Sequence, residues 1–203
     1  NQRMSTLKIN NLSCQRGYNL LFENLSFELN SGEVLKISGP NGSGKTSLIK
    51  ILAGLNSFET GSIKYDDTKI NSEKYNLDFL YLGHLAALSP ELSCLENLKY
   101  TANLGNNNIN LDFYDALTKV GLEKFENELV GKLSAGQRKR IALSLLFITQ
   151  SKVWLLDEPF SALDSKAIKI IETRIEDHCS TGGLCILTTH QECNIKNIKE
   201  ISL

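Results

Sequence analysis

The chain has 203 residues, 41 % of them hydrophobic and 22 % charged, and its formal net charge is −1. This length is typical of one globular domain with a sizeable core, and the near-neutral charge argues against nucleic acid or an anionic membrane surface as a partner. The longest apolar run, residues 141–148, is interrupted by Ser144 and is too short to span a bilayer.

The first part of the chain is rich in strands. Alternating apolar and polar side chains predict half-buried strands, and an apolar run before a glycine-rich loop predicts a buried one. Strands are predicted at residues 7–14, 20–29, 32–38, 61–65 and 77–82, with a helix at 46–54 after the loop.

The middle of the chain is helical, and strands return after it. Helices are predicted at residues 95–104, 113–120 and 135–149, with a polar break at 106–110. A buried strand at 153–156, a helix at 165–179, a strand at 184–188 and an edge strand at 198–203 follow. This order predicts an α/β fold in which a helical insertion, about residues 84–150, interrupts a nucleotide-binding core.

The glycine-rich loop carries the clearest chemistry. It fits the pattern G-x-x-x-x-G-K-[ST] and stands between a strand and a helix, a context that favours a phosphate-binding loop over a plain turn. Its backbone N–H groups and the positive end of the following helix would surround the phosphates of ATP. The predicted nucleotide-binding residues are Gly39, Pro40, Asn41, Gly42, Ser43, Gly44, Lys45, Thr46 and Ser47. Lys45 would contact the β- and γ-phosphates, and the Thr46 hydroxyl would bind Mg²⁺.

A second acidic motif completes the predicted site. An apolar strand ends in Asp157 and Glu158, followed by Pro159. Asp157 could hold Mg²⁺, and Glu158 could orient or deprotonate the attacking water. A solvated turn is the alternative for these residues, and the phosphate-binding loop upstream favours the catalytic interpretation.

Three further motifs make the chain resemble the ATP-binding cassette (ABC) ATPases. Residues 133–137 (LSAGQ) resemble the family's LSGGQ signature, residues 161–164 resemble the D-loop, and residues 188–190 resemble the switch histidine. The resemblance implies a single nucleotide-binding domain, residues 1–203, with a P-loop NTPase core lobe (about 1–83 and 151–203), an antiparallel β subdomain and a helical lobe (about 84–150). It also implies a dimer of two copies that encloses two ATP molecules. The implied roles are γ-phosphate binding across the dimer for Ser134, Gly136 and Gln137, catalysis for His190 with Lys45 and Glu158, and coupling for Asp164.

The signature has an ordinary structural interpretation as well. Ser134 could be a helix N-cap whose capping box is closed by Gln137, and this is compatible with phosphate binding. The basic run at residues 138–140 is more typical of a solvated helix face than of a nucleic-acid site.

A narrower resemblance links the chain to the ATPase subunit of the cytochrome c maturation haem exporter. The shared series includes YLGH at 81–84, LENL at 95–98, LDEPF at 156–160 and LTTHQ at 187–191. It implies integral-membrane permease partners at the cytoplasmic face of a bacterial inner membrane, haem or a haem-loaded chaperone as cargo, and a coupling role for His84, where most cassettes have Gln. An ATPase for another exporter, or a non-transport cassette acting on DNA or ribosomes, remains an alternative.

The adenine contact stays open between two residues. Alignment on residues 21–22 places Arg16 where relatives carry an aromatic residue, and a guanidinium plane can stack on adenine. Tyr18, two residues away, is the alternative, unless it lies in an exposed turn.

The five cysteines fit a reduced cytosolic setting, because their number is odd and no C-x-x-C pair occurs. The group His178, Cys179, Cys185, His190 and Cys193 could suggest zinc, but its spacing matches no common zinc pattern. We favour ordinary buried thiols.

Overall fold

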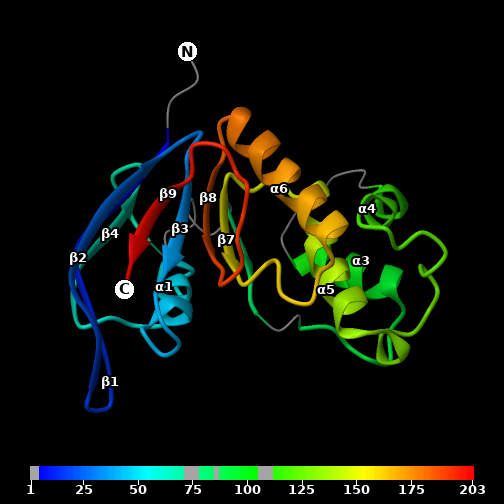
Figure 1. Cartoon of the computed structure of the whole chain (residues 1–203), viewed down its shortest axis with the longest axis horizontal. Helices are drawn as coiled ribbons and strands as arrows, with labels where there is room; N and C mark the ends of the chain where they lie inside the picture. The colour runs from blue at the N-terminus through cyan, green and yellow to red at the C-terminus, as the bar shows by residue number, and fades with distance from the viewer. Residues whose placement is uncertain (1–4, 71–77, 85–86, 105–111) are drawn as a thin grey trace.

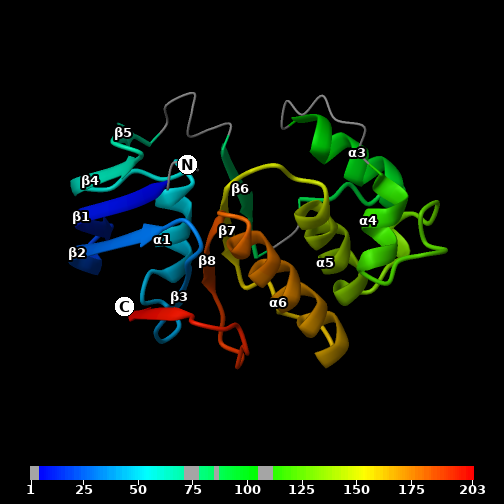
Figure 2. The same cartoon turned by 90° about the horizontal axis from the view of Figure 1, so that it is seen from above.

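The computed structural model describes residues 5–70, 78–84, 87–104 and 112–203. An antiparallel sheet lies at one end of the molecule, a parallel sheet in the middle, and helices α3, α4 and α5 at the other end (Figures 1 and 2). Leu77, the predicted start of one strand, and the predicted polar break at 106–110 lie outside the described residues.

The antiparallel sheet has the strand order β2-β1-β4-β5. Its strands are β1 (Thr6–Arg16), β2 (Asn19–Asn30), β4 (Thr60–Tyr65) and β5 (Thr68–Lys69). The sequence did not predict β5, which has two residues. It pairs with β4 across a two-residue turn in which Asp66 and Asp67 have φ values of 48° and 65°. Both positive values suit a hairpin turn, and aspartate tolerates them better than most residues.

The central sheet is parallel throughout and has the order β6-β7-β8-β3-β9. Its strands are β6 (Phe79–Leu82), β7 (Val153–Asp157), β8 (Leu184–Thr188), β3 (Val34–Ser38) and β9 (Lys199–Ser202). Strand β9 lies at an edge, as predicted for residues 198–203. All residues of β7 and β8 are buried, as expected for parallel strands covered on both faces.

Alternate residues of these strands belong to two different cores, because successive side chains point to opposite faces. Val153 and Leu155 pack with helix α1 (Lys45–Leu52) and the antiparallel sheet, whereas Trp154 and Leu156 pack with helix α6 (Ser165–Ser180) and the helices beyond it. The sheet is therefore anchored on both faces, and its strand ends are held at fixed positions.

The described residues between β6 and β7 form three α-helices: α3 (Cys94–Leu104), α4 (Phe113–Lys119) and α5 (Ala135–Ser144). The prediction of one α-helix over residues 135–149 was wrong at its end. The α-helix stops at Ser144, and a short 3₁₀ helix, η2 (Leu145–Phe147), follows it. The buried Ser144 hydroxyl bonds to the Ile141 carbonyl at 2.6 Å, a local bond that competes with regular α-helical geometry. No helix among the described residues is long and apolar enough to cross a membrane.

Candidate nucleotide-binding site

The carboxyl ends of four parallel strands meet at one edge of the central sheet, the usual place for a ligand in such folds. The glycine-rich loop follows β3, His84 follows β6, Asp157 ends β7 and His190 follows β8. An open cavity of about 660 Å³ lies there. Its lining residues are Arg16, Leu21, Asn41, Gly42, Gly44, Lys45, Thr46, Ser47, His84, Glu158, Ser161, His190 and Gln191.

The glycine-rich loop needs glycine for two different reasons. A β-carbon on Gly39 would lie 2.7 Å from the Leu203 carbonyl oxygen, and φ is 140° there. Gly44 has φ of 102° and forms the N-cap of α1 without a side-chain cap. The first N–H groups of α1 are therefore available to an anion.

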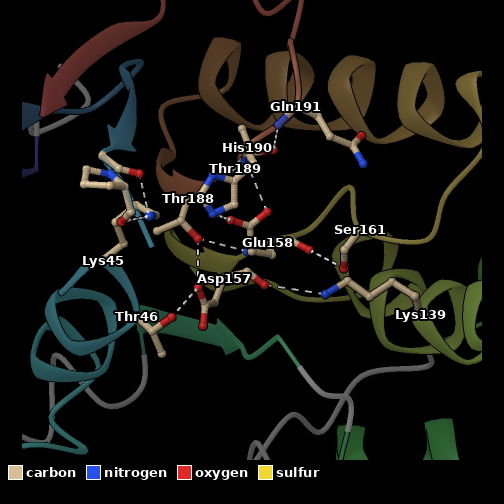
Figure 3. A network of polar contacts seen from close by, with 12 residues as sticks. Lys45, Thr46, Lys139, Asp157, Glu158, Ser161, Thr188, Thr189, His190 and Gln191 are labelled. Carbon is tan, nitrogen blue, oxygen red and sulfur yellow. Dashed lines mark hydrogen bonds and ion pairs between the residues drawn. The ribbon is translucent and has the colours of Figure 1, made fainter. Parts of the chain in front are cut away.

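Lys45 and Thr46 start α1 and point in different directions (Figure 3). The Lys45 ammonium folds back over the loop and donates to the carbonyl oxygens of Gly39 at 2.7 Å and Pro40 at 2.9 Å. The Thr46 hydroxyl donates to Asp157 Oδ1 at 3.2 Å. One cation and one hydroxyl thus stand at the same helix end.

Asp157 is almost fully buried, with 1 % of its surface exposed. Its Oδ1 accepts hydrogen bonds from Thr46 and from Thr188, the latter at 2.8 Å. Its Oδ2 is buried and has no hydrogen-bond partner among the described residues. A free carboxylate oxygen beside a threonine hydroxyl is a donor set that fits Mg²⁺, which prefers oxygen ligands and is usually held by few carboxylates.

Glu158 follows in a left-handed backbone conformation with φ of 50°, which is uncommon for a residue other than glycine. Its Oε1 lies 3.5 Å from His190 Nε2, and its Oε2 accepts the His190 backbone N–H at 3.4 Å (Figure 3). The two predicted catalytic side chains therefore face each other across the ends of β7 and β8.

Thr188 was missed as a site residue. Its hydroxyl donates to Asp157 and accepts the Glu158 backbone N–H at 3.0 Å, so one side chain orders both acidic residues. The sequence did contain one signal for Thr188, because it is the only polar residue of the otherwise apolar strand β8.

The LSAGQ segment lies at the start of α5, outside the lining of the cavity. Ser134 and Gln137 form the predicted capping box, with bonds of 3.2 and 2.9 Å. A β-carbon on Gly136 would lie 2.6 Å from the Ala162 carbonyl oxygen, so α5 packs closely on the D-loop-like segment.

The basic run at residues 138–140 is not one solvated face, and this prediction was wrong. Lys139 is 6 % exposed, and Arg140 forms an ion pair of 2.6 Å with Asp164; only Arg138 is exposed. The cause is that Lys139 points to the main-chain carbonyls of His84 and Asp157, whereas Arg140 points to Asp164, the N-cap of α6. The hydrogen bond from the Ala167 N–H, helped by Arg140, lowers the pKa of Asp164.

Three remaining candidates differ in their surroundings. Arg16 lines the cavity, whereas Tyr18 is fully exposed in the turn between β1 and β2 and does not line it. His84 is exposed at the junction of this cavity with a second one of about 480 Å³, which extends between Tyr81 and α5.

The cysteine and histidine group lies away from the cavity, except for His190. Burial raises the pKa of the Cys179 thiol to about 12 and raises that of Cys185. The His178 ring is stacked on Trp154 with centroids 3.7 Å apart. Within the described ranges, no group of three or more His, Cys, Asp and Glu side chains is arranged to hold a metal ion.

The profile of the family described as "ABC transporter" matches residues 22–161. The chain belongs to the ABC transporter family. It is 42 % identical over 200 residues to the cytochrome c biogenesis ATP-binding export protein CcmA of Haemophilus influenzae, covering 97 % of this chain and 94 % of that protein. It is 45 % identical over 194 residues to CcmA of Mannheimia succiniciproducens, covering 94 % and 90 %.

Solved ABC structures have the same fold. An ABC transporter ATP-binding protein from Pyrococcus furiosus superposes with a TM-score of 0.85 at 24 % identity, covering 98 % of this chain and 97 % of that one. An ATP-binding cassette solved as a dimer with ADP and Pi gives a TM-score of 0.79 at 23 % identity, covering 91 % and 88 %. The predicted ABC fold and the resemblance to the cytochrome c biogenesis subunit are confirmed, and the chain is an ATP-hydrolysing ABC subunit.

Proposed function

We propose that this chain powers haem export, or the release of a haem-loaded chaperone, in cytochrome c maturation. The observation that carries the proposal is the 42–45 % sequence identity, over nearly the full length of the chain, with cytochrome c biogenesis ATP-binding export proteins. The facing pair of Glu158 and His190 beside the glycine-rich loop supports ATP hydrolysis as the source of work.

The chemistry follows from the placement of the side chains. The loop N–H groups and the Lys45 ammonium would bind the phosphates, once ATP oxygens replace the Gly39 and Pro40 carbonyls as partners of Lys45. Thr46 and Asp157 would hold Mg²⁺, which supplies charge neutralisation at the phosphate oxygens. Glu158 would orient and deprotonate the attacking water, and His190 would hold the Glu158 carboxylate and donate toward the γ-phosphate.

The site would be completed by a second copy of the chain. Ser134, Gly136 and Gln137 lie outside the cavity of their own chain, at the exposed N-terminal end of α5. In a head-to-tail dimer, this helix end would bind the γ-phosphate held by the partner. One cassette domain over residues 1–203, with its core and helical lobes, is the unit that closes and opens.

The membrane partners would be the permease subunits of the cytochrome c maturation system, reached at the cytoplasmic face of the bacterial inner membrane. His84 is suited to couple them to the site, because it borders both cavities. Asp164 is suited to couple the two copies, because it joins α6 to α5 through Arg140. Nucleic acid is not proposed as a partner, since the net charge is −1. Arg16, at the cavity, is the proposed adenine contact.

The decisive experiment separates ATP binding from hydrolysis. Glu158→Gln keeps the shape of the side chain but removes the base, so we expect MgATP binding with accumulation of an ATP-bound dimer in size-exclusion chromatography. Lys45→Ala is the matched variant, because it should lose ATP binding and dimerisation together, with turnover at least about a hundredfold lower. Native turnover in Glu158→Gln would remove Glu158 from its proposed role.

The cargo assignment needs its own experiment. Affinity purification of the chain from membranes should recover integral-membrane cytochrome c maturation subunits, and deletion of the chain should abolish cytochrome c assembly. Recovery of a permease unrelated to cytochrome c maturation, with normal cytochrome c assembly, would assign the ATPase to another exporter.

A further inference from the structure

Lys139 is a buried cation that the proposed mechanism does not use. It lies on α5, two residues after Gln137, with 6 % of its surface exposed. Its ammonium has two hydrogen-bond partners among the described residues, the main-chain carbonyl of His84 at 3.3 Å and that of Asp157 at 3.5 Å. Figure 3 shows the second of these bonds. Asp157 is the last residue of β7, and His84 lies two residues after the end of β6.

This arrangement is poor as a stabilising device. Burial lowers the pKa of the Lys139 ammonium, although the charges of Asp157 and Glu158 favour its protonated form. Both hydrogen bonds are long, and neither acceptor is a carboxylate. Burying an ammonium is costly when no carboxylate is paired and hydrogen-bonded with it. Stability alone therefore does not account for a lysine here.

The position of Lys139 differs from that of its neighbours in a way that suggests another role. Arg138 is exposed and bonds back to its own loop at Leu133, and Arg140 reaches Asp164. Lys139 instead connects α5, which begins at the proposed γ-phosphate-binding signature, to the main chain that carries His84, Asp157 and Glu158. A movement of α5 would be transmitted through this ammonium to both strand ends.

We propose that Lys139 is a positioning residue for ATP hydrolysis, whose ammonium holds two main-chain positions fixed relative to helix α5: His84, just after β6, and Asp157, at the end of β7. It acts through the main chain and touches neither nucleotide nor water. The inference rests on the proposed function, because it concerns the same hydrolysis site.

The test replaces the charge and keeps the packing. Lys139→Met should lower kcat about tenfold or more and leave KM for ATP within about twofold, while the melting temperature stays equal or rises. Hydrogen exchange should become faster at the backbone amides at the ends of β6 and β7. Lys139→Arg, which keeps the charge, should recover part of kcat. Lys132→Met, an exposed lysine just before α5, is the control and should match the parent protein.

Each other outcome has a defined meaning. Unchanged kcat and unchanged exchange in Lys139→Met would overturn the proposal, as would a fall in turnover that follows a fall in melting temperature. If Lys139→Met does not fold, Lys139→Gln provides the same comparison with a polar side chain. A fully active Lys139→Met beside an inactive Glu158→Gln rejects only the role of Lys139, whereas an active Glu158→Gln rejects the hydrolysis site itself.

Discussion

A single hydroxyl orders the two acidic residues of the site. Thr188 Oγ1 donates to Asp157 Oδ1 at 2.8 Å and accepts the Glu158 N–H at 3.0 Å. The contact to Glu158 matters because its backbone is in the left-handed region, where most side chains are disfavoured unless the surroundings hold them. Thr188 is completely buried, so water cannot replace these bonds.

We therefore predict that Thr188→Val lowers turnover more than ATP affinity. The substitution keeps the shape but leaves the Glu158 N–H without its acceptor, at a cost of about 1–3 kcal/mol in the free energy of unfolding. A similar loss of positioning would reduce kcat roughly tenfold. Steady-state ATPase assays and urea unfolding measure both effects. Thr188→Ser retains the hydroxyl and should behave like the parent; equal losses in both variants would contradict the role of the hydroxyl.

At the level of residues, the sequence predicted those candidates that belong to fixed motifs. Lys45, Thr46, Glu158 and His190 stand at one cavity because the motifs follow adjacent parallel strands. Thr188 and Lys139 could not be found in this way, since their importance depends on which strand or helix packs beside them. The exposure of Tyr18, which favours Arg16 as the proposed adenine contact, likewise depends on the geometry of the turn.

The LSAGQ signature forms the start of helix α5, which packs against the D-loop-like segment at Ala162. At Gly136 the helix lies close to the segment after β7, since an added β-carbon would meet the Ala162 carbonyl oxygen at 2.6 Å. The preceding residue, Ala135, is exposed. Close packing therefore requires a glycine at position 136, whereas Ala135 faces solvent in the single chain.

We predict that Gly136→Ala weakens ATP-dependent dimerisation, because the start of α5 must move away from Ala162. Overpacking of this kind costs about 1–3 kcal/mol of stability. Ala135→Gly is the matched control, as it changes the neighbouring signature position without a clash and should dimerise normally. Analytical ultracentrifugation with ATP measures the difference; identical dimerisation of both variants and the parent would contradict this packing constraint.

At the level of elements, periodicity predicted the strands and helices whose burial is regular. Strands β7 and β8 are apolar up to their last residues, Asp157 and Thr188, because both faces of the sheet are covered. The two-residue strand β5 is too short to leave a pattern, and the change from α5 to η2 depends on the buried Ser144 hydroxyl. Such local competition among hydrogen bonds has no periodic signal.

For the whole molecule, His178 links stability to pH. Burial against Trp154, with the nearby Arg174 charge, lowers its pKa to about 4, and hydrogen bonds to the main chain of Lys152 and Leu184 oppose this shift. The unfolded chain, with a pKa near 6.5, then binds a proton more readily than the folded protein. The contribution of neutral His178 is therefore complete above about pH 6.5 and is lost as the pH falls toward 4.

We predict that His178 alone lowers the free energy of unfolding by about 3 kcal/mol between pH 6.5 and pH 4, at about 1.4 kcal/mol per pH unit. Chemical denaturation measures the free energy of unfolding of the parent and of His178→Phe across this pH range. Subtracting one curve from the other removes the titration of the carboxylates, which both proteins share. The phenylalanine variant should be less stable at neutral pH, where it lacks the bond to Lys152, and should show a shallower slope. Parallel curves would show that His178 does not titrate with unfolding.

The contact between Gly39 and residue 203 has a practical use. Leu203 lies beside the glycine-rich loop, with its N–H bonded to the Ser38 carbonyl at 3.0 Å. Four of the five native cysteines are buried, and Cys193 is partly buried, as is Leu203. With Cys193 replaced by serine, a thiol introduced at position 203 could therefore be labelled selectively. A polarity-sensitive dye at this position would sit next to the arriving phosphates and convert nucleotide occupancy into a fluorescence signal, without altering any residue assigned to catalysis.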